Sequence, residues 1–206
     1  MKYILGIDIG TTAIKAAVIG EDGEIYGTKT SEYPLTTLPS GEVEADLSLY
    51  EEAFKQSIKE SVKNARVPVK DIKCVGFSST AETCVFLDEN NKPLCKVIAW
   101  MDTRATKEAK ELTEQFEKQD IIKKVGFDGI YAIHPVSKIL AVKHKTPEIF
   151  EKTRMFAQIK DYFIFKLTGT YYTDHSTASD HGFFDITNRC YWNEMLEFTG
   201  IKEEYL

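Results

Sequence analysis

The stretch Tyr3–Lys15 constrains the fold more than any other part of the sequence, because an apolar run of strand length ends there in a tight turn. The run carries one carboxylate, Asp8, which is costly to bury unless it is paired, hydrogen-bonded or serving a metal. Gly10 then allows a ligand to approach the backbone closely, and Thr11 and Thr12 add hydroxyl and N–H donors. Two interpretations fit: a site for a phosphate with its divalent cation, or an ordinary strand end followed by a turn.

A hairpin, and not a helix, is expected after this turn. The glycine-rich Walker pattern that opens a helix is absent, and only a short element fits before the next turn at residues 20–23. Short β-branched runs separated by Gly and Asp turns are typical of antiparallel strands. The sequence therefore predicts an antiparallel meander with strands near residues 3–9, 12–19 and 24–33.

The remainder of the chain alternates between helical and strand patterns. Apolar residues recur at helical spacing over 47–65, and residues 72–79 read as a strand buried on both faces. A further strand pair is expected at 83–87 and 97–100. Further helices are expected near 103–118, 119–125, 136–145, 147–152, 159–167 and 192–198. This order predicts one mixed α/β domain with helices on a central sheet.

Charge and cysteine usage narrow the classes of partner. The 206 residues carry a net charge of −6 without a basic block, which makes nucleic acid and acidic membrane surfaces poor partners. No long uncharged apolar run suits a membrane span. The four cysteines lack a C-x-x-C pair, which argues against a zinc site and fits a reduced, cytoplasmic location.

Two further groups of residues suit a polyhydroxy ligand. Glu82 follows the expected strand 72–79, at the kind of strand end where ligands bind in open α/β sheets. Trp100, Asp102 and Arg104 offer an apolar wall with an acceptor and a donor, which suits a polyol. Each group also has a plainer interpretation. Glu82 could lie in a solvated loop, and Asp102 or Thr103 could cap the next helix, with Arg104 in a surface ion pair.

Several motifs together resemble those of the FGGY carbohydrate kinases, within the actin-like ATPase superfamily. The resemblance covers essentially all 206 residues and is carried by Gly6–Thr12, Trp100–Arg104, Lys160–Gly169, Thr173–Ser179, and Phe184-Asp185 with Trp192. It implies a ribonuclease H-like (actin-like) α/β domain, with a mixed central sheet opened by an antiparallel β-meander and flanked by helices. It also implies phosphorylation of a small sugar or polyol with ATP and Mg²⁺. Asp8 would serve the metal, with Gly10, Thr11, Thr12 and Lys15 at the phosphate, and Ala81, Glu82, Trp100, Asp102 and Arg104 at the sugar.

The sequence also departs from the family pattern. Pro135 and Lys138 match a family signature, but Ala141 stands where Trp is usual. Ala81-Glu82 matches neither the Arg-Glu of glycerol kinases nor the Met-His of xylulose kinases. The substrate is therefore open, with a ketopentose such as xylulose ahead of gluconate and glycerol.

The family's general base is an aspartate expected beyond Leu206, and its carboxy-terminal nucleotide-binding domain also lies beyond this chain. Residues 1–206 are thus expected to fold, to be inactive alone, and to belong to a full-length protein that could form homo-oligomers. Two other classes stay open: a nucleotide-driven actin-like protein without a sugar substrate, and a non-catalytic sugar-binding module.

Overall fold

A computed structural model describes all 206 residues, and they form two compact units. Unit 1 contains residues 1–35 and 46–80, and unit 2 contains residues 36–45 and 81–206. Each unit has a main sheet of its own, and that of unit 1 is mixed, with antiparallel and parallel pairs. The strands after Ser79 pair with one another or with residues 43–45, and not with the first sheet.

Unit 1 is built on the predicted meander. β1 (Tyr3–Ile9), β2 (Ala13–Gly20) and β3 (Ile25–Glu32) are antiparallel neighbours, and β6 (Ile72–Ser79) pairs in parallel with β1. The strand order is β3-β2-β1-β6. The second predicted strand, 12–19, is present as β2 with its start at Ala13, so this segment is strand and not helix.

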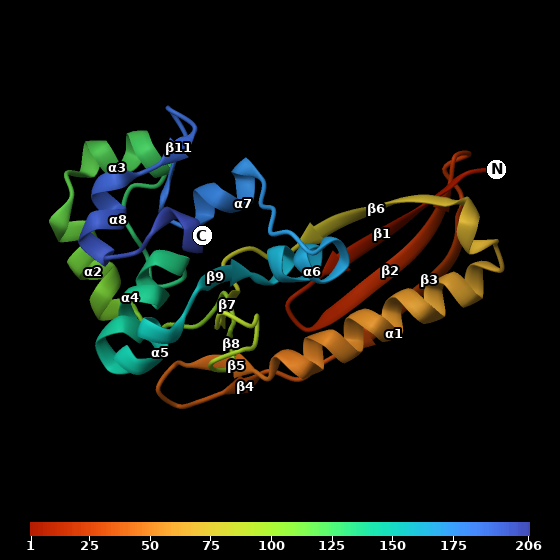
Figure 1. The fold of residues 1–206 in the computed structure, drawn as a ribbon, viewed down its shortest axis with the longest axis horizontal. Helices are drawn as coiled ribbons and strands as arrows, with labels where there is room; N and C mark the ends of the chain where they lie inside the picture. Colours follow the sequence, from red (N-terminus) through yellow and green to blue (C-terminus); the bar gives the residue numbers. More distant parts are fainter. The chain divides into compact units, whose positions relative to one another are not determined.

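One long helix, α1 (Leu47–Ala65), lies along one face of this sheet (Figure 1). Alternate residues of β1 and β2 point toward it, so that Ile9 and Ile14 are fully buried while their neighbours in sequence are more exposed. The helix approaches β3 closely at Gly27, where an added Cβ would lie 2.3 Å from the Ala65 amide nitrogen. A short 3-10 turn, η1 (Val69–Asp71), then leads into β6.

The prediction that residues 72–79 are buried on both faces is wrong. β6 is an edge strand with β1 as its single neighbour, and Val75 is 43% exposed. α1 packs mainly on β2 and β3, and on β6 the ring of Phe77 stacks on that of Phe54, 6.3 Å away. An apolar sequence is therefore not sufficient to bury a strand when the covering helix lies over its neighbours.

Unit 2 contains a second sheet of short antiparallel strands. The predicted pair is present as β7 (Cys84–Leu87) and β8 (Val97–Ile98). The sequence reading missed its partners β5 (Val43–Ala45) and β9 (Met155–Gln158). With β4 (Thr36–Thr37) the order is β4-β5-β8-β7-β9, and β10 (Phe184–Asp185) pairs separately with β11 (Cys190–Tyr191).

Seven helices complete unit 2 and enclose a core that includes Leu112, Ile121, Phe183 and Trp192. They are α2 (Thr106–Gln115), α3 (Lys118–Val125), α4 (Pro135–Lys145), α5 (Pro147–Lys152), α6 (Ile159–Thr168), α7 (His175–Asp180) and α8 (Asn193–Thr199), followed by the 3-10 turn η2 (Glu203–Tyr205). Of these helices, only α7 was not predicted from the sequence. It has six residues and begins after Asp174, whose side chain caps it by accepting the Thr177 N–H at 2.9 Å.

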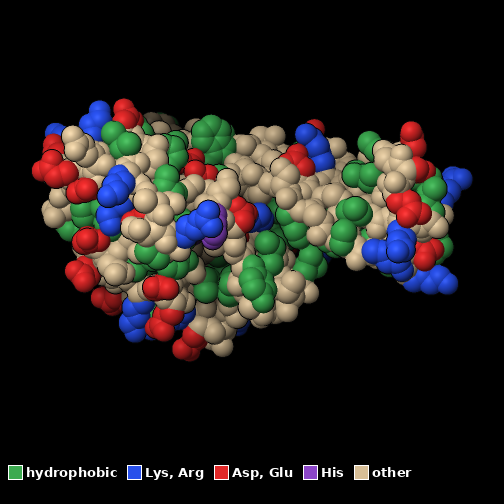
Figure 2. Space-filling model, turned by 90° about the horizontal axis from the view of Figure 1, so that it is seen from above, with side chains coloured by type: hydrophobic (Ala, Val, Ile, Leu, Met, Phe, Trp, Pro, Cys, Tyr) green, Lys and Arg blue, Asp and Glu red, His purple; other side chains and the backbone are tan.

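The surface and the helix lengths bear on the predicted partners. Acidic and basic side chains are interspersed on the face that Figure 2 shows, and the exclusion of nucleic acid stays a prediction. None of the helices combines the length and the apolar character that a membrane crossing requires.

Candidate functional site

The tip of the β1–β2 hairpin places the two predicted threonines in a short, well-anchored loop. Ile9 and Ile14 are register partners, and the Gly10 N–H donates to the Ala13 carbonyl at 3.0 Å, which leaves Thr11 and Thr12 at the tip. Tyr33, the residue that follows β3, donates its hydroxyl hydrogen to the Gly10 carbonyl. The turn is therefore held from a neighbouring segment as well as by its own hydrogen bond.

Asp8 and Lys15 face each other across this hairpin. They are register partners, with Asp8 Oδ2 3.8 Å from Lys15 Nζ. The Asp8 side chain is 44% exposed and that of Lys15 is 63% exposed, so the cost of burying this carboxylate does not arise. The alternation along β1 explains this result, because Ile7 and Ile9 turn to α1 while Asp8 points to the opposite face.

That opposite face of the sheet is hollowed beside Asp8. A pocket of about 580 Å³ has Asp8, Lys15 and Ser78 in its lining, and its floor includes Gly6 and Gly76, which are register partners and add no side chains. The five residues predicted for phosphate and metal, Asp8, Gly10, Thr11, Thr12 and Lys15, thus lie together on one hairpin of unit 1.

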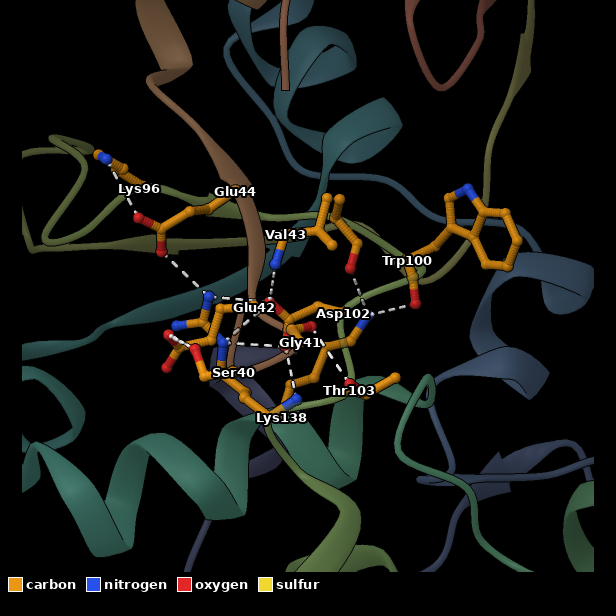
Figure 3. Close-up of polar contacts among 12 residues, drawn as sticks. Ser40, Gly41, Glu42, Val43, Glu44, Lys96, Trp100, Asp102, Thr103 and Lys138 are labelled. Carbon is orange, nitrogen blue, oxygen red and sulfur yellow. Dashed lines mark hydrogen bonds and ion pairs between the residues drawn. The ribbon is translucent and has the colours of Figure 1, made fainter. Parts of the chain in front are cut away.

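In unit 2, Asp102 is the centre of a buried ionic network (Figure 3). Its side chain has no exposed surface and accepts from the Val43 N–H at 2.6 Å and from Arg104 Nη2 at 2.8 Å. Arg104 Nη2 also reaches Glu44 at 3.0 Å, and Lys96 Nζ lies 3.1 Å from the same carboxylate. Burial tends to raise the pKa of Glu44, but hydrogen bonds from Arg104 and Lys96 outweigh it and lower the pKa.

This network joins β5 to the segment that follows β8. Asp102 does not cap α2, which begins after Ala105. The Arg104 side chain is only 15% exposed, so its pair with Asp102 is largely withdrawn from the surface. Contact of Asp102 and Arg104 with a sugar stays a prediction, and the partners found for both side chains are residues of unit 2.

Trp100 and Glu82 are brought into one arrangement by a buried lysine of α4. Lys138 Nζ donates to the carbonyls of Glu82 at 2.7 Å, Ala99 at 2.9 Å and Trp100 at 3.1 Å. The indole of Trp100 points away from the Asp102 carboxylate (Figure 3). Ala81 adds only a methyl group beside Glu82.

The Glu82 carboxyl lies in a poorly solvated environment beside a histidine. Its Oε1 is 3.7 Å from His134 Nε2. Burial raises the pKa of Glu82 to about 7, although the charge of Lys138 works in the opposite direction. Burial, helped by the charge of Lys138, lowers the pKa of His134 to about 4. The sequence analysis missed His134; its position immediately before the family-matching Pro135 was the signal available.

Comparison with known proteins is consistent with the motifs. The chain matches the FGGY family of carbohydrate kinases, N-terminal domain, over residues 3–206, and it belongs to that family. It is 31% identical over 206 residues to a xylulose kinase of Bacillus subtilis, covering 99% of this chain and 40% of that protein. It is 32% identical over 206 residues to a gluconokinase of the same organism, covering 100% of this chain and 39% of that protein.

The fold also matches a solved structure of this family. A gluconate kinase from Lactobacillus acidophilus superposes with a TM-score of 0.91 at 29% identity, over 100% of this chain and 41% of that one. The family and the ribonuclease H-like α/β class predicted from the sequence are thereby confirmed. The chain spans about two fifths of the length of these relatives.

Proposed function

We propose that residues 1–206 supply phosphate-binding and sugar-binding residues of an ATP-dependent carbohydrate kinase. The β1–β2 hairpin carries this proposal, because it sets the hydroxyls of Thr11 and Thr12 at a tight tip and the exposed carboxylate of Asp8 next to it. The relatives named xylulose kinase and gluconokinase support the same class of reaction.

The donors of the hairpin fit a nucleotide phosphate with Mg²⁺. Mg²⁺ keeps several waters and needs only one or two protein carboxylates; Asp8 offers one, and no group of three acidic, His or Cys residues is present to form a larger cage. Bound Mg²⁺ would neutralise charge on the phosphates. The Gly10 N–H is used within the turn, so we assign the phosphate contacts to Thr11, Thr12 and Lys15.

The residues around Glu82 favour a neutral sugar over a sugar acid. The carboxyl of Glu82 can accept from a hydroxyl, and the indole of Trp100 can cover a carbon face of the sugar. The two cations that bind this segment, Lys138 and Arg104, are already occupied by carbonyls and carboxylates. Ala81 supplies no charge to a substrate. We therefore place a ketopentose such as xylulose ahead of gluconate and glycerol.

A calorimetric titration of residues 1–206 with xylulose, gluconate and glycerol tests the substrate class. We expect xylulose to bind most tightly, and Trp100→Ala to weaken its binding about tenfold through loss of stacking area. The substitution Trp192→Phe, in the core of unit 2, is the control and should leave sugar affinity unchanged. Tightest binding of gluconate would contradict the charge argument, and binding of none of the three would contradict the sugar site itself.

The catalytic part of the proposal needs a longer protein. The proton of the sugar hydroxyl requires a base, which we place beyond Leu206, and general-base catalysis typically contributes about 10²–10⁴ in rate. Residues 1–206 alone should therefore release ADP only slowly with ATP, Mg²⁺ and sugar. Full-length protein should do so rapidly, and sugar-dependent release at kinase rates by residues 1–206 would show that the base lies within them.

A further inference from the structure

Glu82 has a backbone conformation that its surroundings must enforce. Its φ is 61°, in the left-handed region that non-glycine residues rarely adopt. Three other non-glycine residues share that conformation: Arg66 ends α1, Asn91 lies in the turn after β7, and Arg189 lies in the turn between β10 and β11. Glu82 neither ends a helix nor closes a hairpin, and such strain is typical of functional positions.

Two buried side chains hold the peptide groups on both sides of Glu82. Gln158, at the end of β9, accepts the Glu82 N–H through Oε1 at 2.7 Å. Lys138, in α4, donates to the Glu82 carbonyl at 2.7 Å. Gln158 is 1% exposed and Lys138 is fully buried. Because both groups come from distant parts of the sequence, the conformation depends on the folded unit and not on the local chain.

Each of these side chains is itself fixed by further hydrogen bonds. Gln158 Nε2 donates to the Thr177 carbonyl at 2.9 Å, which leaves its Oε1 turned toward Glu82. Lys138 Nζ donates its two other hydrogen bonds to the carbonyls of Ala99 and Trp100. Rotation of either side chain would therefore break a second hydrogen bond and leave its polar groups unsatisfied.

The clamped backbone directs the Glu82 carboxyl to a defined place. Its side chain is 13% exposed, and Oε1 faces the Nε2 of His134 at 3.7 Å. The Tyr131 N–H donates to His134 Nδ1 at 3.1 Å, so in the neutral ring the proton sits on Nε2, on the side of Glu82. The carboxyl thus faces His134 and keeps a small exposed area that a ligand hydroxyl can reach.

We infer that Gln158 and Lys138 are positioning residues for sugar recognition, because together they hold Glu82 in its left-handed conformation. The ammonium group of Lys138 also fixes the backbone at Trp100, through its hydrogen bond to the Trp100 carbonyl. This inference rests on the proposed function, in which Glu82 and Trp100 contact the sugar. Preorganisation of this kind removes the ordering cost that a mobile carboxyl would add to binding.

The first test measures the clamp without any sugar. In residues 1–206 we expect Gln158→Met to speed hydrogen exchange of the Glu82 amide at least tenfold, because the amide loses its acceptor. Gln158→Glu keeps that acceptor and should keep most of the protection. Thr199→Val removes a buried hydroxyl that bonds within α8 and should leave this amide unchanged. Unaltered exchange in Gln158→Met would overturn the clamp.

The second test measures whether the clamp acts through Glu82. We expect Gln158→Met to weaken xylulose binding about tenfold in otherwise unchanged protein, and less than twofold when Glu82→Ala is already present. A merely structural role would weaken binding equally in both backgrounds, and that result would overturn the inference. If unchanged protein binds none of the three sugars, the proposed function fails, while the exchange measurement still decides the clamp.

Discussion

The hairpin around Asp8 and the segment around Glu82 present a carboxylate by opposite means. Asp8 belongs to a regular strand, and its partner Lys15 is seven residues away in sequence and opposite in register. Glu82 has a strained backbone held by Gln158 and Lys138, 76 and 56 residues away. Asp8 is well solvated, whereas burial raises the pKa of Glu82 to about 7.

Under the proposed function, the two carboxylates serve different ligands, and this accounts for the difference between them. The ligand proposed for Asp8, a metal-bound phosphate, brings its own charge, so an exposed carboxylate on a regular strand is sufficient, and local sequence can specify it. A neutral sugar offers only hydroxyls and carbon faces, so the protein must supply orientation, which takes buried contacts from several elements. We therefore expect substitutions at the hairpin to affect catalysis, and substitutions around Glu82 to affect stability and affinity together.

The largest expected effect is that of Asp8→Asn in a full-length kinase that contains this chain. Loss of an electrostatic group that acts mainly in the transition state typically lowers the rate about 10²–10³-fold, and sugar affinity should not change. ADP release and sugar titration measure the two quantities. Asp22→Asn, in the turn before β3 and hydrogen-bonded to Tyr26, is the control. Unchanged turnover in Asp8→Asn would make Asp8 a structural residue.

Lys138→Met should destabilise unit 2 by about 2–3 kcal/mol. Three carbonyls, one in a buried and two in partly buried hydrogen bonds, lose a donor, at about 1–3 kcal/mol for a buried group left unsatisfied. Removal of the buried ammonium offsets part of that loss. Both tryptophans, Trp100 and Trp192, belong to unit 2, so urea unfolding followed by their fluorescence reports on this unit.

Lys143→Met is the matched control for that substitution. Its ammonium is less buried and donates to one carbonyl, that of Thr199, at 2.8 Å. We expect a loss of about 1 kcal/mol or less. Equal losses for the two lysine variants would show that the three-carbonyl arrangement adds no stability.

The same contrast explains which parts of the fold and of the candidate site could be predicted from the sequence. The β1–β2 hairpin was predicted correctly because its pattern is local: an apolar run, a glycine turn and a second β-branched run. Gln158 was missed because its role depends on the pairing of β9 with β7, two strands that lie far apart in the sequence. The exposure of β6 was missed because burial depends on where α1 lies and not on the strand's own residues.

Gly27→Ala tests the packing that holds the hairpin's sheet to its helix. The new Cβ would lie 2.3 Å from the Ala65 nitrogen and 2.5 Å from the Ser61 carbonyl oxygen, and overpacking of this kind costs about 1–3 kcal/mol. Gly76→Ala on β6 is the control, because its Cβ would meet nothing within 4 Å. Thermal unfolding followed by circular dichroism should separate the two variants. Equal melting temperatures would contradict the close approach of α1 to β3.

The smallest expected net effect comes from two opposing pH dependences in unit 2. The pKa of Glu82 is raised from 4.5 to about 7, so between these values the unfolded carboxyl has lost its proton while the folded one keeps it. The contribution of Glu82 to stability is therefore present below about pH 4.5 and is lost as the pH rises through about 7. The pKa of His134 is lowered from 6.5 to about 4, and its contribution instead grows as the pH rises between about 4 and 6.5.

Because the two windows overlap, the net change from this pair in the unaltered chain should be small, and single substitutions should reveal each part. With tryptophan fluorescence and urea, the stability difference between unaltered chain and Glu82→Gln should fall as the pH rises from about 4.5 to 7. The difference between unaltered chain and His134→Asn should rise from about pH 4 to 6.5. Each slope can approach the value for one proton bound differently by the folded and unfolded states, or about 1.4 kcal/mol per pH unit.

Lys138 and Asp180, the other charged groups that act on Glu82, stay unchanged in both variants. A flat difference for Glu82→Gln would mean that its carboxyl titrates normally in the folded unit, and the contrast with the solvated Asp8 would then disappear.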